Sequence, residues 1–343
     1  GSNSTAVGRA ALANQNFTTA TDSFNTAVGA NAGVEVTTGI SNTLIGGQSG
    51  DALTDADDNV AVGRLALSTD TLGSKSTAVG RGALKTQNFT TATDSNNTAV
   101  GYSAGEAVTT GTDNTLIGTL CGDAITDGNT NTAVGSFALT TNQRGDRNTA
   151  IGHEALKTLN PSGDADTYNT AVGYQSGKAV TTGTVNTLIG SLSGDALTTG
   201  EENTAVGYQS LGSATKSDNN VAIGNSALGA LNHTTQTNAF NTAVGYAAGS
   251  AVNTLIGGQA GDALTDADNK VAFGTNALGT DTLGSYSVAI GARALLTQNF
   301  TTATNSCNTA VGGDVGVSVT TGIDNPLIGA FAGDALTTAE ANV

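Results

Sequence analysis

The sequence predicts an all-β fold, a parallel β-solenoid (β-roll) of about 19 coils. A pentapeptide of the form Asn-Thr-Ala-Val-Gly recurs 19 times along the 343 residues and always closes on a glycine, from Gly8 to Gly329. These glycines are mostly 17 or 21 residues apart, and four coils make a 72-residue superrepeat. Short apolar runs alternate with Gly, Thr and Asn, which is typical of strands and turns and disfavours helices.

The regular spacing predicts one continuous repeat array over residues 1–343, without a linker. One coil is shorter, because Gly245 and Gly257 are only 12 residues apart. The missing residues fall at a turn between apolar positions, so we expect the strand stack to continue across them. Both ends read as repeat sequence without a polar cap, which favours a window cut from a longer fibre.

Each pentapeptide predicts a short strand with two faces. The residue before the glycine is Val, Ile or once Phe273, and we expect this row to be buried inside each chain. The preceding residue is Ala in fourteen copies and Leu in five, and strand alternation places it on the opposite face. Monomers rarely leave such an apolar stripe in water, so we expect a homotrimeric rod held by this file. Its leucines are the candidate trimer interface: Leu44, Leu116, Leu188, Leu255 and Leu327.

Two further repeated positions predict how a coil turns. Asn stands four residues before the glycine in 15 copies, where stacked side-chain amides can hydrogen-bond to their neighbours. Leu or Gly follows the glycine by four residues, as at Leu12 and Gly33, and we expect a second, weaker inward position there.

Every fourth coil carries four extra residues, which should bulge outward from the stack. These loops are either a row of weak binding sites acting by avidity or a tolerated insertion copied with the unit. Three of them share the string QNFTTAT, and the candidate contact residues are Phe17, Phe89 and Phe300. Asn-x-Thr sequons make Asn16, Asn88, Asn232 and Asn299 candidate glycan sites, although plain Thr/Asn turn chemistry is the favoured explanation, because short sequons arise easily in such a composition.

Composition argues against several classes of function. Only 12 Lys and Arg stand against 28 Asp and Glu, and a net charge of −16 does not suit nucleic acid. No stretch approaches the length of a membrane span, so we expect no membrane insertion. The two cysteines, Cys121 and Cys307, lie too many coils apart to pair, and we expect both to be buried small residues.

The sequence predicts no catalytic residue, no cofactor site and no metal site. The two histidines are not equivalent in the repeat, and no glycine-rich string has the ending of a phosphate-binding loop. Aspartates recur once per superrepeat, as at Asp51 and Asp123, but their neighbours do not keep the spacing of calcium ligands. A solvated acidic stripe is therefore the expected arrangement, and we do not expect an enzyme.

The strings at residues 97–104, 169–176 and 287–295 resemble the head repeats of trimeric autotransporter adhesins of the YadA type. They are also similar to the NTAVG-repeat shafts of phage tail fibres and related virus-encoded fibres. The resemblance implies a left-handed parallel β-roll, three chains side by side, and an extracellular place on a virion or cell surface. The longer coils and the 72-residue period depart from the adhesin pattern and favour the phage-fibre side.

We therefore expect a structural extracellular fibre shaft whose partners are two further copies of itself and, through the loops, a host-surface glycan or receptor. The alternative is an ice- or carbohydrate-binding solenoid, although a strand with one Thr does not provide the flat two-file Thr array of ice-binding faces. A polysaccharide-degrading tailspike would need two carboxylates paired in one cleft, and the recurrent aspartate is single.

Overall fold

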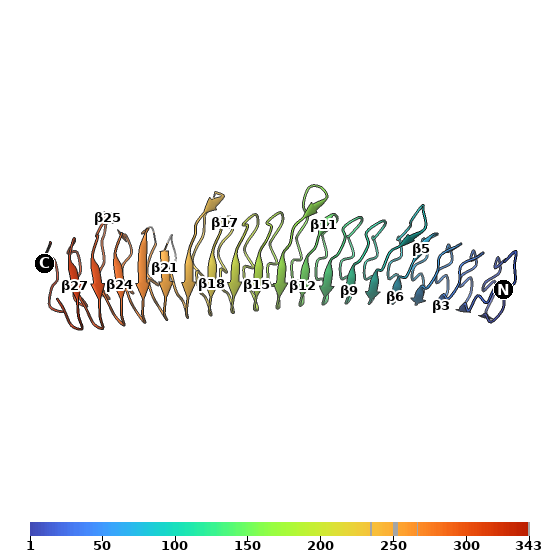
Figure 1. The fold of residues 1–343 in the computed structure, drawn as a ribbon, viewed down its shortest axis with the longest axis horizontal. Coiled ribbons are helices and arrows are strands. Elements are labelled where there is room, and N and C mark those ends of the chain that lie inside the picture. Colours follow the sequence, from blue (N-terminus) through green and yellow to red (C-terminus); the bar gives the residue numbers. More distant parts are fainter. Residues whose placement is uncertain (234, 250–252, 266, 342–343) are drawn as a thin grey trace. The chain divides into compact units, whose positions relative to one another are not determined.

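The computed structural model describes residues 1–233, 235–249, 253–265 and 267–341. Nineteen short strands form one parallel sheet, which confirms the predicted β-solenoid of about 19 turns (Figure 1). No helix occurs in these described ranges. The tertiary contacts fall into two compact units, Gly1–Thr182 and Gly183–Val343, and each is described by itself.

The strands of the large sheet come one from each coil. In the first unit they are β1 (Thr5–Val7), β2 (Thr26–Val28), β3 (Thr43–Ile45), β4 (Val60–Val62), β6 (Thr77–Val79), β8 (Thr98–Val100), β9 (Thr115–Ile117), β10 (Thr132–Val134), β12 (Thr149–Ile151) and β14 (Thr170–Val172). In the second they are β15 (Thr187–Ile189), β16 (Thr204–Val206), β18 (Val221–Ile223), β20 (Thr242–Val244), β21 (Asn253–Ile256), β22 (Lys270–Phe273), β24 (Val288–Ile290), β26 (Thr309–Val311) and β27 (Pro326–Ile328). Equivalent residues pair, so Ala99 of β8 lies beside Leu116 of β9.

Four smaller parallel pairs mark long coils. They are β5 (Gly73–Ser74) with β7 (Thr93–Asp94), β11 (Gly145–Asp146) with β13 (Ala165–Asp166), β17 (Ser217–Asp218) with β19 (Thr237–Asn238), and β23 (Gly284–Ser285) with β25 (Thr304–Asn305). The chain extends beyond the neighbouring coils near β5, β11 and β17 (Figure 1). This agrees with the expected outward bulge.

The two faces of each strand are the reverse of the expectation. The Ala/Leu file is buried within the single chain at every copy except Ala6 of the first coil, and Ala99 and Leu116 are fully inaccessible. The Val/Ile file faces out instead, with Ile45, Ile117 and Ile189 39–40% exposed. The prediction of a buried Val/Ile row is therefore wrong, although the alternation itself is correct.

The interior is narrow, and this explains the reversed faces. Where the strand carries leucine, the opposite wall carries glycine: a Cβ added to Gly105 or Gly122 would lie 2.7 Å from a methyl carbon of Leu116. Where the strand carries alanine in the first and fourth coils, the opposite wall carries a buried leucine, as at Leu67 and Leu84. Each of these coils therefore holds one large side chain between the strand and the opposite wall. Packing to normal protein density requires a small residue across from it. The expected second inward position is confirmed.

The glycine that closes each strand is required by the stacking of coils. At Gly101 φ is +146°, and an added Cβ would lie 2.3 Å from the carbonyl oxygen of Gly118 in the next coil. Side chains cannot approach a backbone atom that closely, so only glycine allows adjacent coils to stay at strand spacing.

Buried asparagines form a ladder between coils, as the sequence predicts. The backbone N–H of Asn114 donates to Oδ1 of Asn97 at 2.9 Å, and that of Asn131 donates to Oδ1 of Asn114 at 3.0 Å. The Nδ2 of Asn114 donates to the carbonyl of Gly128 at 2.8 Å. Each amide thus joins two coils and pairs backbone groups that would otherwise be buried without partners.

The strand stack continues across the shortened coil. Thr242, Ala243 and Val244 of β20 pair with Thr254, Leu255 and Ile256 of β21 in the repeat register. The asparagine ladder continues as well, since the backbone N–H of Asn253 donates to Oδ1 of Asn241 at 2.8 Å. Residues 250–252 of that coil lie outside the described residues.

Candidate functional site

The broad face of the sheet carries two outward files in both units. Val or Ile, with Phe273 once, forms one file, and none of its 19 members is buried. The residue two positions earlier, most often Thr and half-buried, forms the other, because alternate residues of a strand share a face. Thr98 with Val100 and Thr115 with Ile117 are neighbouring pairs in this array. We call the two files together the Thr/Val face.

The leucines predicted to form a trimer interface do not reach this face. Leu44, Leu116, Leu188 and Leu255 are fully buried inside the single chain, and Leu327 is 7% exposed. Their side chains fill the space over glycines of their own and adjacent coils, such as Gly33 and Gly50 around Leu44. An interface through the Ala/Leu file is therefore wrong, because these residues already have their packing partners.

The phenylalanines predicted as loop contacts also turn inward. Phe89 and Phe300 are only 6% and 5% exposed, so a contact role is wrong for both. A Cβ on Gly73 would meet the Phe89 ring at 2.8 Å, and Gly284 stands in the same way against Phe300 at 2.7 Å. Phe17 is half-buried and lies against Gly1. The rings close the long coils from within.

A buried polar network explains the rest of the QNF string, and sequence reasoning missed it. Gln87 Nε2 donates to Asp70 Oδ2 at 2.6 Å and to Ser76 Oγ at 2.8 Å, while its Oε1 accepts from Asn97 at 2.9 Å. The backbone N–H groups of Gly73 and Phe89 donate to Asp70 Oδ1 at 3.0 and 3.2 Å. Every one of these buried groups thus has a partner.

The signal for this network was present in the repeat. Asp is followed 17 residues later by Gln in two superrepeats, at Asp70 with Gln87 and at Asp281 with Gln298. In the other superrepeats the same two positions hold Asn142 with Leu159 and Ala214 with Leu231. The two positions change together because their side chains share one buried space.

The candidate glycan sites are accessible. Asn16, Asn88, Asn232 and Asn299 are all exposed. In three of them the side-chain Oδ1 accepts a hydrogen bond from a Thr hydroxyl of the preceding coil, at 3.0 Å for Asn88, 2.9 Å for Asn232 and 2.8 Å for Asn299. The turn chemistry is therefore present at these three sites, and glycosylation stays a prediction.

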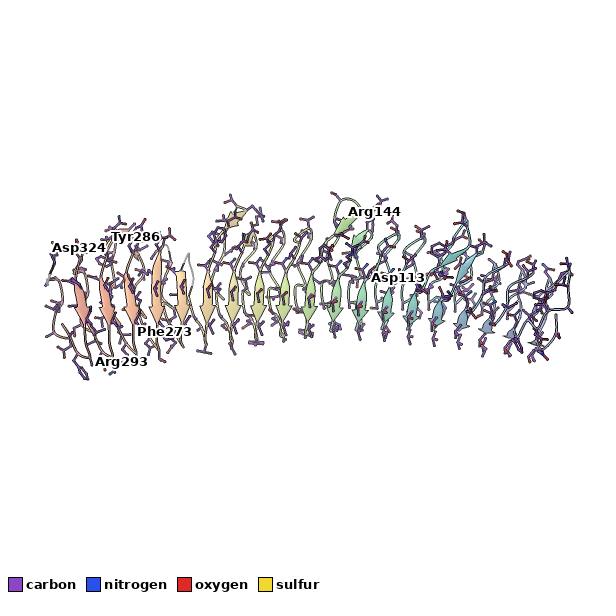
Figure 2. All side chains as sticks on the ribbon, viewed as in Figure 1. Asp113, Arg144, Phe273, Tyr286, Arg293 and Asp324 are labelled. Atoms are coloured by element: carbon purple, nitrogen blue, oxygen red, sulfur yellow. The ribbon has the colours of Figure 1, made fainter. Side chains whose placement is uncertain are left out.

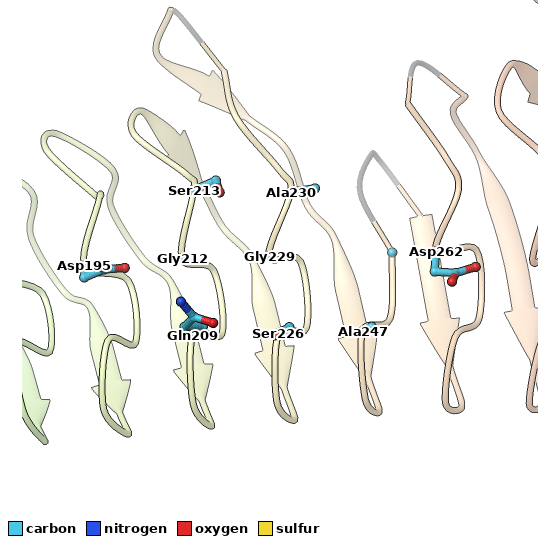
Figure 3. Close-up of a pocket in the computed structure, with 10 residues that line it drawn as sticks. Asp195, Gln209, Gly212, Ser213, Ser226, Gly229, Ala230, Ala247 and Asp262 are labelled. Atoms are coloured by element: carbon cyan, nitrogen blue, oxygen red, sulfur yellow. The ribbon is translucent and has the colours of Figure 1, made fainter.

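A hollow of about 490 Å³ opens on the second unit between Asp195 and Asp262 (Figure 3). The hollow is open because Gly212 and Gly229, which have no side chain, stand at the repeat position that Asp195 and Asp262 occupy at its two ends. Burial raises the pKa of Asp262. The two carboxylates are four coils apart, roughly 19 Å at strand spacing. That separation does not suit the paired acids of glycoside hydrolysis, which stand about 5–10 Å apart.

The other titratable groups are scattered. No group of three or more His, Cys, Asp or Glu side chains comes together as a metal site within the described ranges. Asp51 and Asp123 each bury an Oδ1 without a hydrogen-bond partner, and burial raises the pKa of both carboxyls. Cys121 is buried as expected, but Cys307 is exposed, because its position lies on the outer turn where the chain has φ of +48°. The described residues include no helix long and apolar enough to cross a membrane.

The turn before each strand carries exposed side chains that vary from coil to coil. Its residues have positive φ and include Tyr168, Phe240 and Tyr286, which are 49%, 64% and 51% exposed. Figure 2 shows Tyr286 and Asp324 on one edge of the second unit and Arg293 on the other. The turn after each strand also varies, and Tyr102, Tyr174 and Tyr246 are exposed there, so coils differ from one another at both edges of the strand.

No protein-family model, curated protein or solved structure matches the chain. The resemblance of its pentapeptides to adhesin heads and phage fibres therefore stays a prediction. What the chain offers for function is its own surface: the Thr/Val face, the long coils and the hollow of the second unit.

Proposed function

We propose that the protein is the shaft of an extracellular fibre, of a virion tail or a cell surface, in which three copies pack side by side through their Thr/Val faces. The observation that carries this proposal is the outward Val/Ile file, whose members Ile151 and Ile223 are 38% and 39% exposed in the single chain. A continuous apolar file of this kind is rarely left in water by a monomer.

The geometry favours another copy of the same chain as the partner. The Val/Ile side chains recur once per strand, at a spacing of about 4.8 Å along the stack. Only a surface with the same period meets this file in every coil, and a second copy laid alongside has that period. The resemblance to trimeric fibres supports three copies around a common axis.

The solution mass of the protein tests this proposal. We expect analytical ultracentrifugation to give three times the chain mass of 33.6 kDa. The double variant Ile117→Asp with Ile151→Asp should dissociate this assembly, because charges would be buried without partners at the axis. The matched control places the same charges on exposed apolar residues of the outer turns, Val185→Asp with Phe240→Asp, and should remain assembled. A wild-type monomer at micromolar concentration would contradict the proposal.

Contact with a host surface is proposed at the tips of the long coils. Thr90, Thr91 and Ala92 are exposed there, whereas the neighbouring Phe89 is not. Repeated weak sites on one fibre bind by avidity. Replacing residues 90–92 and 301–303 by Gly-Ser-Gly should weaken binding of the assembled fibre to host cells by more than tenfold; unchanged binding would exclude the tips.

Ice binding is a second candidate, and the reversed strand faces favour it. Thr and Val point outward together, so two regular files of side chains with methyl groups lie on the same face of the sheet. The same face cannot serve both functions. A monomer with thermal hysteresis would favour ice binding, and a trimer without it would favour the fibre.

A further inference from the structure

Lys270 occupies an unusual position in the asparagine ladder. Four residues before the strand glycine, 15 coils carry Asn, three carry Ser and one carries this lysine. Its backbone N–H donates to Oδ1 of Asn253 at 2.9 Å, as an asparagine's would. Its side chain turns into the coil, where Nζ meets Oδ2 of Asp281, and both side chains are completely inaccessible to solvent.

The carboxylate does not need the lysine to be satisfied. Asp281 accepts from the backbone N–H of Gly284 at 3.1 Å and from the side-chain amide of Gln298. The equivalent Asp70 is equally buried and accepts from the same donors, Gly73 and Gln87, with Asn59 at the ladder position. The lysine therefore adds an amine to a carboxyl group that the fold already accommodates without one.

The surroundings bury the Lys270 amine beside the carboxyl group of Asp281. Phe300 closes the coil over Gly284 and Asp281 and is itself 5% exposed. Burial lowers the pKa of the Lys270 ammonium. A desolvated amine is a nucleophile, and the backbone N–H of Gly284, which donates to Oδ1, stabilises the negative charge that develops on that oxygen when the carboxyl group is attacked.

We propose that Lys270 and Asp281 are joined by an intramolecular isopeptide bond. A proton passes from Nζ to Oδ2 along their hydrogen bond, and the Nζ lone pair forms a bond to Cγ of Asp281. The backbone N–H of Gly284 holds the resulting oxyanion on Oδ1, while the side-chain N–H of Gln298 donates to the departing Oδ2. A second Nζ proton moves to the Oδ2 hydroxyl, the Cγ–Oδ2 bond breaks and one water leaves. An amine and a carboxyl thus become an amide and water, without oxidation or reduction.

The bond would be a covalent cross-link between two positions of a single coil, through the interior of that coil. Lys270 precedes the strand glycine of that coil by four residues and Asp281 follows it by seven. One coil, which begins with β21, separates this coil from the shortened one, where the stack has lost five residues of turn. A covalent link there would hold the coil closed independently of whether chains assemble.

The mass of the denatured full-length protein tests the bond directly. We expect wild-type protein to be lighter than its sequence by one water, and Lys270→Asn, which restores the common ladder residue, to have its full sequence mass. Trypsin should fail to cleave after Lys270, so residues 217–293 should appear as one peptide lighter by one water. Its fragmentation spectrum should lack backbone fragments from between residues 270 and 281.

Two results would overturn the proposal. One is wild-type protein at its full sequence mass. The other is a loss of one water together with normal tryptic cleavage after Lys270, because the water would then have been lost elsewhere. Neither result depends on the folding of a variant, since both are measured on the wild-type chain.

Discussion

Asparagine is the residue that ties one coil to the next. In most coils its side chain is fully buried, accepts from the backbone of the following coil and donates to a carbonyl further along the chain. Three replacements keep the position polar with serine, and in each of these coils a glutamine from the long loop donates to the serine hydroxyl: Gln15, Gln87 and Gln298. The residue type at this position is therefore determined by the need to give each buried polar group a hydrogen-bond partner.

Replacing Asn114 by Leu should be costly. The change leaves the N–H of Asn131 and the carbonyl of Gly128 buried without their partners, at about 1–3 kcal/mol for each. Asp113→Asn on the exposed neighbouring residue is the control and should change stability by less than about 0.5 kcal/mol. Chemical denaturation measures both, and equal effects would contradict the role of the ladder.

The two thiols should differ sharply in reactivity. Cys121 is buried, its Sγ contacts the carbonyl of Ala133 at 3.1 Å, and burial raises its pKa to about 12. The thiolate is the reactive form, so Cys121 should be inert in native protein at pH 8. We expect an alkylating reagent to modify only the exposed Cys307 before denaturation and both cysteines after it. Rapid native labelling of Cys121 would contradict its placement in the core.

The ion pairs of Glu154 should make the folding stability of the protein depend on pH. Hydrogen bonds from Lys157, Lys178 and Gln175 lower its pKa from 4.5 to about 2. Because the folded pKa is depressed, the stabilisation is complete above the unfolded value and is lost as pH falls from about 4.5 towards 2. The melting temperature of wild type should exceed that of Glu154→Gln at pH 6, and the difference should disappear near pH 2. A difference independent of pH would show that the ion pairs contribute nothing.

At the scale of the strand, alternation was predictable and its direction was not. Bulky Val and Ile indicated a core, whereas small Ala indicated a contact between chains. The structure reverses this because a narrow coil has room for one large side chain between its strand and the opposite wall, and leucine from that wall supplies it in the coils whose strands carry Ala61 and Ala78. Recognising that Leu in the strand goes with Gly across the interior, as Leu116 does with Gly105 and Gly122, would have placed the file correctly.

Adjacent residues of one strand should therefore respond oppositely to truncation. Leu116→Ala empties a fully buried site and should cost about 2–5 kcal/mol of folding stability. Ile117→Ala shortens an outward side chain that is 39% exposed, and should affect the fold of the chain far less. Denaturation of the dissociated chain compares them. A larger loss of stability for Ile117→Ala than for Leu116→Ala would contradict the structure and support a buried Val/Ile file.

For the whole molecule, the repeat alone predicts the coil number, the parallel stack, the outward bulges and the continuity across Gly245 and Gly257. The repeat period predicts these features because each coil must stack on its neighbour at the spacing of hydrogen-bonded strands. The contact residues were not predictable in the same way. Phe89 was assigned to the surface since it lies in an insertion, yet it packs over Gly73, and that contact exists only after the long coil folds back on the preceding one.

Cysteine cross-linking on the Thr/Val face tests most directly whether this face joins three copies. In a Cys121→Ala, Cys307→Ser background, Ile117→Cys should form a disulfide between chains under mild oxidation, because equivalent residues of parallel copies meet near a common axis. Leu116→Cys, one residue away but buried, should form none. Cross-linking through residue 116, or no cross-linking through residue 117 at concentrations where the protein is assembled, would contradict a fibre shaft built on this face.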